Sequence, residues 1–337
     1  MSHGPWTIRA YRPGDERVLT ELFARVFKKP ISTAHWLWKL RGYELPFENV
    51  WLALDGERII AQYAGIPVRV QTTAGNRWAV LSVDTMVDPD YRRRGVLTQI
   101  ARHAYAQWGE AGAAFVYGLP NEKAAPGLAS LGFNHAFPIR WRRQALRPFA
   151  ILARRYNIKF PTTSLDGLWR LVSTSRRSRT DIELVEARDA DGGFDRIFRR
   201  FEPNSHLTLV RDRQWIEWRY FRAPEFGYRL LIARQAQEPL GYVAYRMQNT
   251  SGVIAEVFAP SDRVSVALMQ GAIEHLRKSG AESVRTLAVP GTPYDLRCRQ
   301  MLFSPYKNFG LAVLPLATDI STNPNAWRLS GGDFDVV

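Results

Sequence analysis

Cysteine is almost absent from this chain of 337 residues, in which Cys298 stands alone, so no disulfide can form within the chain. The six histidines are not spaced from other ligand-type residues as a metal site requires. No run approaches the roughly 20 apolar residues of a membrane span, and residues 1–12 lack the apolar core of a signal peptide. These absences predict a cytoplasmic chain in a reducing compartment, with no structural metal and no membrane span.

Negative charge is also scarce, because 32 acidic residues face 46 lysines and arginines and leave a net charge of +14. Such an excess suits nucleic acid, an anionic membrane surface or a negatively charged substrate, and it does not choose among them. The arginines gather in two places, the triplet at 92–94 and the stretch 140–180. The simplest interpretation of the second place is a solvated segment between domains.

Apolar spacing in the first half predicts a sheet with helices beside it. Residues 7–27 have the pattern of a strand, a turn and a helix, and residues 50–87 have that of an antiparallel meander. Apolar residues four apart over 96–108 form one face of a helix. Two more strand patterns, over 113–120 and near 137–143, follow. The prediction is an α/β (α+β) fold with a mixed, largely antiparallel central sheet flanked by helices.

The second half repeats the layout of the first. At an offset of 180, Trp38 matches Trp218, and two small residues of the meander match two in the second half. Further pairs follow in the same order at offsets of 171 and 170. A sparse repeat with a nearly constant offset predicts duplication. We expect one domain at 1–145, a basic interdomain segment at 146–185 and a second domain at 186–337. The matched small residues are Ala53 with Ala233 and Ala61 with Gly241.

The arginine triplet belongs to the segment "DPDYRRRGVLTQI", residues 88–100, between a predicted strand and a predicted helix. Backbone N–H groups at a helix start, with arginines beside them, form a site for an anion. Gly95 allows the backbone to approach a ligand without a Cβ in the way. The second half has "APSDRVSVALMQG" at the equivalent place, without the triplet or the glycine. This pattern predicts a pyrophosphate site in the first half.

The same segment resembles the signature of the GNAT acyltransferases, a family that binds acetyl-CoA. That signature is Arg or Gln, two residues, Gly, one residue, then Gly or Ala, after a strand that ends in V-x-P-x-Y-R. The sequence departs from it at Leu97, which replaces the small residue. The resemblance covers the first 140 residues and implies a tandem protein whose second GNAT-like domain is degenerate. The matching residues are Val87, Pro89, Tyr91, Arg92 and Gly95.

The resemblance also implies the cofactor and its contacts. Acetyl-CoA or another acyl-CoA is the expected co-substrate. The backbone of Met86 and Val87 is expected to hold the pantetheine arm, and Asn121 to contact the cofactor from the loop after the next strand. The pyrophosphate is expected at the turn and helix start formed by Arg92, Arg93, Arg94, Gly95, Val96, Leu97 and Thr98.

Asp84 is the candidate general base, because it is a charged residue within the apolar run "LSVDTMV". Burial of such a carboxylate raises its pKa toward a value useful for accepting a proton. In the family the acyl group passes by direct attack, and the backbone N–H of Val87 is the expected oxyanion donor. The family's tyrosine acid is replaced by Leu128. Tyr117 or a water then protonates the thiolate, or the thiolate leaves unassisted.

The expected function is therefore N-acyltransfer to a primary amine of a small molecule or amino sugar. The enhanced-intracellular-survival type of aminoglycoside acetyltransferase is similar in its loop and its second domain, which suggests a polyamine among the acceptors. One alternative is a tRNA-dependent aminoacyltransferase of Fem-like type, with 140–180 as an RNA track. Another is a non-catalytic module that binds CoA or nucleic acid. The intact cofactor turn does not favour nucleic acid.

The C-terminal stretch "NAWRLSGGDFDVV" combines an aromatic residue, a flexible Gly-Gly and two acids, Asp333 and Asp335. In tandem GNAT proteins the second domain can close over the acceptor pocket of the first, and such a tail can supply an acid or a base. A frayed end without a role is the simpler interpretation. Tryptophans 36, 38, 215 and 218 are expected in the core rather than stacked on an acceptor.

Overall fold

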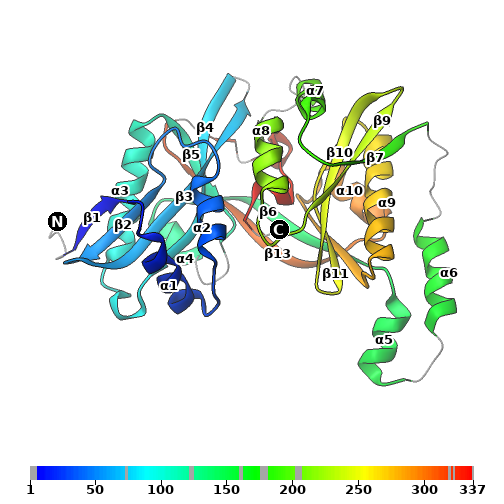
Figure 1. The fold of residues 1–337 in the computed structure, drawn as a ribbon, viewed down its shortest axis with the longest axis horizontal. Helices are drawn as coiled ribbons and strands as arrows, with labels where there is room; N and C mark the ends of the chain where they lie inside the picture. Colours follow the sequence, from blue (N-terminus) through cyan, green and yellow to red (C-terminus); the bar gives the residue numbers. More distant parts are fainter. Residues whose placement is uncertain are drawn as a thin grey trace.

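The computed structural model describes residues 6–72, 75–120, 125–158, 162–174, 181–201, 207–317, 320–321 and 323–335. Within these residues the chain forms two lobes joined by one 14-stranded sheet, with helices packed on its faces (Figure 1). Most neighbouring strands run antiparallel, and the predicted α/β class is confirmed. No helix in the described part of the chain is long and apolar enough to cross a membrane.

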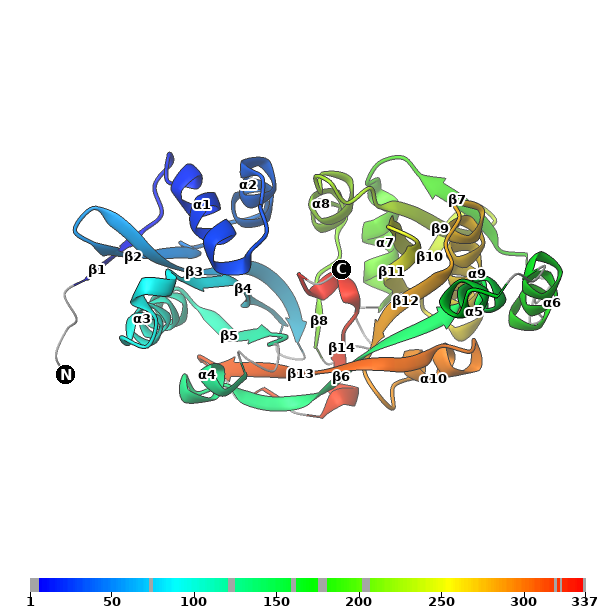
Figure 2. The same cartoon turned by 90° about the horizontal axis from the view of Figure 1, so that it is seen from below.

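The first lobe contains strands in the order β1-β2-β3-β4-β5. Helices α1 and α2 cover one face of this part of the sheet and α3 covers the other (Figure 2). The four α3 residues spaced four apart, from Val96 to Trp108, are all buried, as their spacing predicts. The elements are β1 Thr7–Ala10, α1 Glu16–Phe27, α2 Thr33–Arg41, β2 Val50–Asp55, β3 Arg58–Thr72, β4 Gly75–Val87, the 3-10 helix η1 Pro89–Tyr91, α3 Val96–Glu110, β5 Ala113–Gly118, α4 Ala125–Ser130 and β6 Asn134–Ala145.

The second lobe repeats the same order of elements after a pair of helices. Helices α5 Pro148–Tyr156 and α6 Thr162–Thr174 come first and stand out from the end of the molecule (Figure 1). The lobe itself contains β7 Glu183–Ala187, α7 Gly192–Phe201, β8 Leu207–Leu209, α8 Arg213–Ile216, the π-helix η3 Glu217–Phe221, β9 Arg229–Gln235, β10 Glu238–Gln248, β11 Ser251–Phe258, α9 Asp262–Lys278, β12 Ser283–Ala288, α10 Pro293–Gln300 and β13 Ser304–Pro315.

Residues matched at an offset of 180 occupy equivalent places in the two lobes. Ala53 pairs with Ala61 between β2 and β3, and Ala233 pairs with Gly241 between β9 and β10. The indole rings of tryptophans 38 and 218 stack with centroids 5.4 Å apart. Each indole N–H donates to the backbone carbonyl of the other residue at 2.8 Å. All four predicted core tryptophans are buried, and duplication stays the prediction that accounts for this equivalence.

The two halves exchange their last strands. Strand β13, from the end of the second half, pairs with β5 of the first lobe, and β6 pairs with β12 of the second. β6 and β13 also pair with each other and run side by side beneath both lobes (Figure 2). The predicted domain boundaries at 145 and 186 stay a prediction, because the sheet passes between the lobes without a break.

After β13 the chain returns to the space between the lobes. It forms the 3-10 helices η4 Pro324–Ala326 and η5 Gly331–Asp333, with the short strand β14 Trp327–Arg328 between them. β14 pairs with β8, which in turn pairs with β3 of the first lobe. The described chain ends at Asp335, between the two lobes (Figure 2).

Candidate active site

Strand β5 covers only the first half of strand β4. Their parallel pairing reaches Leu81 and Tyr117 and goes no further, although β4 continues to Val87 and β5 ends at Gly118. The second half of β4 is therefore paired on one side only, with β3. Unpaired backbone groups along a strand can bind an extended ligand as an added strand. Met86 and Val87, predicted to hold a pantetheine arm, lie in this stretch.

A β-bulge places Asp84 in the unpaired stretch. Gln62 pairs with Met86 and Ala64 with Val83, so two residues of β4 lie opposite one residue of β3. Asp84 has a φ of 45°, a left-handed conformation that is uncommon for residues other than glycine. The side-chain amide of Gln62 donates to the Asp84 carbonyl at 3.1 Å and helps to hold it. Such strain concentrates at functional sites.

The carboxylate of Asp84 belongs to an ionic triad with the buried Lys39 and the half-buried Asp335. The Lys39 ammonium on α2 donates to Asp84 Oδ2 and to Asp335 Oδ2, each at 2.9 Å. The exposed fractions are 5% for the Lys39 side chain and 9% for that of Asp84. One cation thus faces two carboxylates, one from β4 and one from the C-terminal tail. The structure brings together the predicted base and the predicted tail acid, and Lys39 is what joins them.

Burial sets the protonation of the triad. Burial raises the pKa of Asp84, and the neighbouring Asp335 adds to this against the opposing charge of Lys39. For Lys39, burial acts to lower the pKa, but the two carboxylates outweigh it and raise the pKa above its ordinary value. His35, one turn earlier on α2, has a pKa lowered by burial and by Lys39, so its imidazole is neutral at neutral pH. Neither His35 nor Lys39 was among the predicted site residues.

A signal for Lys39 was present in the repeat. Lys39 follows Trp38, and at an offset of 180 Arg219 follows Trp218. The Arg219 guanidinium donates to the carbonyls of Gly332 and Phe334 at 3.0 and 2.8 Å. The equivalent cations of the two lobes therefore hold adjacent parts of the same tail.

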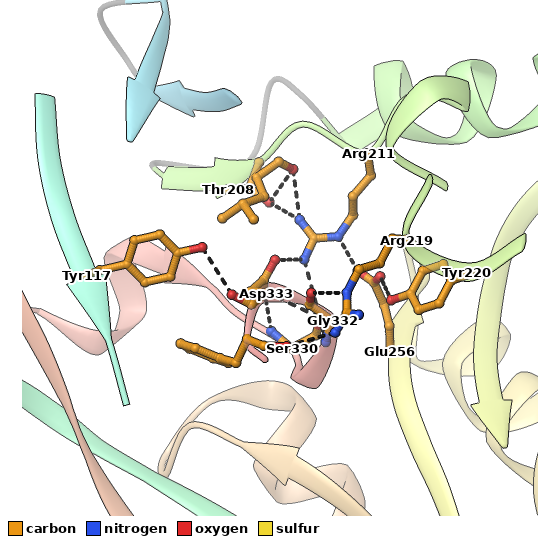
Figure 3. A network of polar contacts seen from close by, with 11 residues as sticks. Tyr117, Thr208, Arg211, Arg219, Tyr220, Glu256, Ser330, Gly332 and Asp333 are labelled. Atoms are coloured by element: carbon orange, nitrogen blue, oxygen red, sulfur yellow. Dashed lines mark hydrogen bonds and ion pairs between the residues drawn. The ribbon is translucent and has the colours of Figure 1, made fainter. Parts of the chain in front are cut away.

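The tail is fixed by a buried polar network (Figure 3). Arg211 donates to Asp333 Oδ1 at 2.6 Å and also pairs with Glu256. Ser330 caps η5, with a backbone N–H that donates to Asp333 Oδ2 at 2.6 Å. A Cβ on Gly332 would lie 2.3 Å from the Tyr220 hydroxyl oxygen, so only glycine fits there. The tail is a packed element of the site, contrary to the simpler interpretation of a frayed end.

Tyr117 serves this network. Its side chain is fully buried, and its hydroxyl donates to the Asp333 carbonyl at 3.0 Å (Figure 3). Burial raises the pKa of Tyr117 well above its ordinary value. Its proton is therefore committed to holding the tail. Leu128 is half-buried on α4 and packs against the core around α3.

The predicted anion turn leads from the end of β4 into α3. Gly95 is the N-cap of this 15-residue helix, with a φ of 83°, and a Cβ there would meet open space. The backbone conformation, more than crowding, thus requires glycine. Arg92 and Arg93 are exposed, and neither guanidinium pairs with a carboxylate of the described residues. Arg94 lies over the Tyr91 ring at 5.3 Å.

The remaining predicted cofactor residues lie around this turn or beyond the described chain. Val96 is buried in the first turn of α3, and Leu97 and Thr98 are half-buried beside it. Helix α3 thus directs its N-terminal N–H groups toward the turn, as expected of an anion site. Asn121 lies outside the described residues.

A family model supplies the decisive comparison. The model of the acetyltransferase (GNAT) domain matches residues 7–136, from β1 to the start of β6. The first lobe is a GNAT acetyltransferase domain. The resemblance on the arginine turn and the expected class of enzyme, an N-acetyltransferase, are thereby confirmed. Among the curated proteins none matches the chain.

Solved structures resemble both lobes of this protein, at identities that show the fold alone. A protein from Enterococcus faecalis V583, described as a probable N-acyltransferase, is 15% identical, with a TM-score of 0.68 over 93% of this chain and 72% of that one. A GCN5-related N-acetyltransferase from Anabaena variabilis is 10% identical, with a TM-score of 0.69 over 92% of this chain and 73% of that one. Another GCN5-related N-acetyltransferase, from Kribbella flavida, is 14% identical, with a TM-score of 0.66 over 93% of this chain and 71% of that one. The GNAT architecture therefore extends beyond the segment that the family model matches.

Proposed function

We propose that this GNAT protein transfers an acetyl group from acetyl-CoA to a primary amine of a small molecule or amino sugar. One observation carries the proposal. A buried carboxylate, Asp84, lies on the unpaired half of β4, whose end leads directly into the turn at Gly95. One continuous segment thus carries both a base and an anion site. This arrangement suits a long ligand whose phosphates bind at the turn and whose far end reacts near Asp84.

The cofactor residues have separate tasks. Acetyl-CoA supplies the acyl group as an activated thioester. The N-terminus of α3, with the exposed Arg92 and Arg93, binds its pyrophosphate through backbone N–H groups and charge-assisted hydrogen bonds. The unpaired edge of β4 at Met86 and Val87 binds the pantetheine arm by strand addition. The reacting thioester then lies near the bulge at Asp84.

Asp84 accepts the proton of the attacking amine. The triad of Asp84, Lys39 and Asp335 holds two carboxylates and one ammonium, and therefore one unit of excess negative charge. Such a site takes up one proton without creating an unpaired buried cation. In the transfer step the amine nitrogen bonds to the thioester carbon, the carbon–sulfur bond breaks, and the amine proton passes to Asp84. Lys39 is a positioning residue that holds the carboxylate in place.

The N–H of Val87 stabilises the oxyanion, because it belongs to the end of β4 that no strand of the described chain covers on the β5 side. Tyr117 is a positioning residue in this proposal, since its hydroxyl already donates to the tail. The departing thiolate needs no dedicated acid. A thiol has a pKa of about 8.5, which makes its thiolate a good leaving group.

Thermal unfolding with and without acetyl-CoA tests the cofactor site. At 100 times its dissociation constant a ligand stabilises the folded state by about 2.7 kcal/mol. We expect this shift in the natural protein and its loss in the double variant Arg92→Glu, Gly95→Val. The matched control is Arg102→Glu, the same charge change at an exposed position of α3 outside the turn, which should keep the shift.

Turnover with a panel of amines and acyl-CoAs of increasing chain length then identifies the acceptor and the acyl group. An unchanged acetyl-CoA shift in the double variant would remove the cofactor assignment. Tight binding of charged tRNA that weakens steeply with salt, without an acetyl-CoA shift, would instead establish the aminoacyltransferase alternative.

A further inference from the structure

The helical hairpin formed by α5 and α6 exposes apolar side chains that the function above does not use. Not one residue of α5 is buried. Four large apolar residues of the hairpin have exposed fractions between 48% and 63%. A monomeric soluble surface seldom gathers several such residues in one place. They are Leu152 at 48%, Tyr156 at 63%, Ile158 at 56% and Leu168 at 60%.

The hairpin is nonetheless firmly attached to the second lobe, through polar contacts. The Arg154 guanidinium donates to Glu282 Oε1 at 2.8 Å, and the Arg170 guanidinium donates to Glu274 Oε1 at 2.8 Å. Asp166 of α6 accepts the first N–H groups of α5 at 3.0 and 3.2 Å. The Trp169 indole donates to the Ala145 carbonyl at 2.8 Å. The exposed apolar residues therefore lie on an ordered surface.

The sequence segment that contains the hairpin is also strongly basic. Residues 147–180 hold eight lysines and arginines against one acidic residue, Asp166, which is a net +7 and half of the +14 of the whole chain. Arg147 and Arg155 make no ion pair with the described residues. Arg155 lies 5.8 Å from the ring of Tyr156, so that charge and apolar surface adjoin.

We propose that the α5–α6 hairpin docks on an anionic lipid bilayer, lying in its interface without crossing it. Leu152 and Tyr156 are one helical turn apart and insert between lipids, while Arg155 and Arg147 contact anionic headgroups. Arginine can keep its head among phosphates while its stem covers apolar surface. The exposed Arg147 and Arg155 beside these apolar side chains favour an anionic membrane over an apolar protein surface.

The exposed aliphatic residues favour a bilayer over nucleic acid, because leucine and isoleucine gain nothing beside a phosphate backbone. The hairpin lies at the far end of the molecule from the arginine turn (Figure 1). Docking there leaves the unpaired half of β4 and the arginine turn free. The inference does not depend on the proposed acetyl transfer, and its test uses no activity.

Co-sedimentation of the full chain with vesicles tests the docking. We expect binding to vesicles that contain phosphatidylglycerol, much weaker binding to pure phosphatidylcholine vesicles, and loss of binding as salt is raised. The double variant Leu152→Ser, Leu168→Ser should bind at least tenfold more weakly, and Arg155→Ala about fivefold more weakly. Leu296→Ser, on α10 with an exposed fraction of 53%, is the matched control and should bind as the natural protein does.

Thermal unfolding confirms that each variant is folded, which is expected because the replaced side chains are exposed. Equal binding to both kinds of vesicle, or to neither, would overturn the proposal. A dimer in sedimentation velocity that the double serine variant abolishes would assign the surface to a second copy of the chain. Binding of RNA but not of vesicles would assign it to nucleic acid. Either result would also overturn the proposal.

Discussion

Removing the cation from the Lys39 triad should destabilise the protein in a way that depends on pH. In Lys39→Met, the buried carboxylate of Asp84 and the half-buried carboxylate of Asp335 would remain without a partner. Breaking a buried ion pair by removing one partner costs about 3–5 kcal/mol. At about 2 °C per kcal/mol for a chain of this size, the midpoint of thermal unfolding should fall by roughly 6–10 °C at pH 7.5.

The loss should be smaller at acid pH. Without Lys39 the pKa of the buried Asp84 rises further, because burial already raises it and the opposing charge is gone. A carboxyl group whose pKa is higher in the folded state adds stability below its unfolded pKa and loses it as the pH rises through the folded value. The difference in unfolding midpoint between Lys39→Met and the natural protein should therefore become smaller from pH 8 to pH 5.

Second-site variants separate charge from shape. Adding Asp84→Asn or Asp335→Asn to Lys39→Met removes a stranded carboxylate and should recover part of the lost stability. Lys278→Met, an exposed lysine at the end of α9, is the control for loss of a positive charge. Equal midpoints for Lys39→Met and the natural protein at pH 7.5, or no recovery in the double variants, would refute the assignment of Lys39 as the partner of both carboxylates.

Three further changes test the base, the tail and its titration. Asp84→Asn should keep the acetyl-CoA thermal shift and lose turnover; full turnover would remove Asp84 as the base. Gly332→Ala should cost about 1–3 kcal/mol of stability through its clash with Tyr220, whereas Gly109→Ala, whose Cβ would meet its nearest neighbour at 3.8 Å, should be tolerated. Burial raises the pKa of Asp333 to about 6, so its contribution to stability is complete below about pH 4 and is lost as the pH rises through 6. In Asp333→Asn, the free energy of unfolding measured with urea should depend less on pH over that range. An unchanged dependence on pH would contradict the assignment.

Local patterns in the sequence predicted the parts of the fold that local physics determines. The four-residue spacing from Val96 to Trp108 predicted the buried face of α3, and "DPDYRRRGVLTQI" predicted the turn before it. The match of tryptophans 38 and 218 anticipated two equivalent positions that proved to be in contact. These features depend on residues close in sequence or on a repeat that can be counted.

The triad and the strand exchange could not be predicted in that way. Lys39 and Asp335 are 296 positions apart, and no periodicity links them. A lysine in a short helix ordinarily faces water, so its burial becomes evident only when the tail is in place. The commitment of the Tyr117 hydroxyl to the tail depends on the same return of the chain between the lobes.

The exchange of β6 and β13 has a consequence for how the protein is made. During synthesis the first lobe emerges before Ser304–Pro315 exists, so β5 has no neighbour on that side until almost the whole chain has left the ribosome. Asp335, which shares Lys39 with Asp84, arrives later still. A chain that stops before Ser304 would therefore carry the complete arginine turn but an unfinished sheet and a Lys39 that lacks its second carboxylate. The order of the strands thus makes the assembled site depend on synthesis of the chain through Asp335.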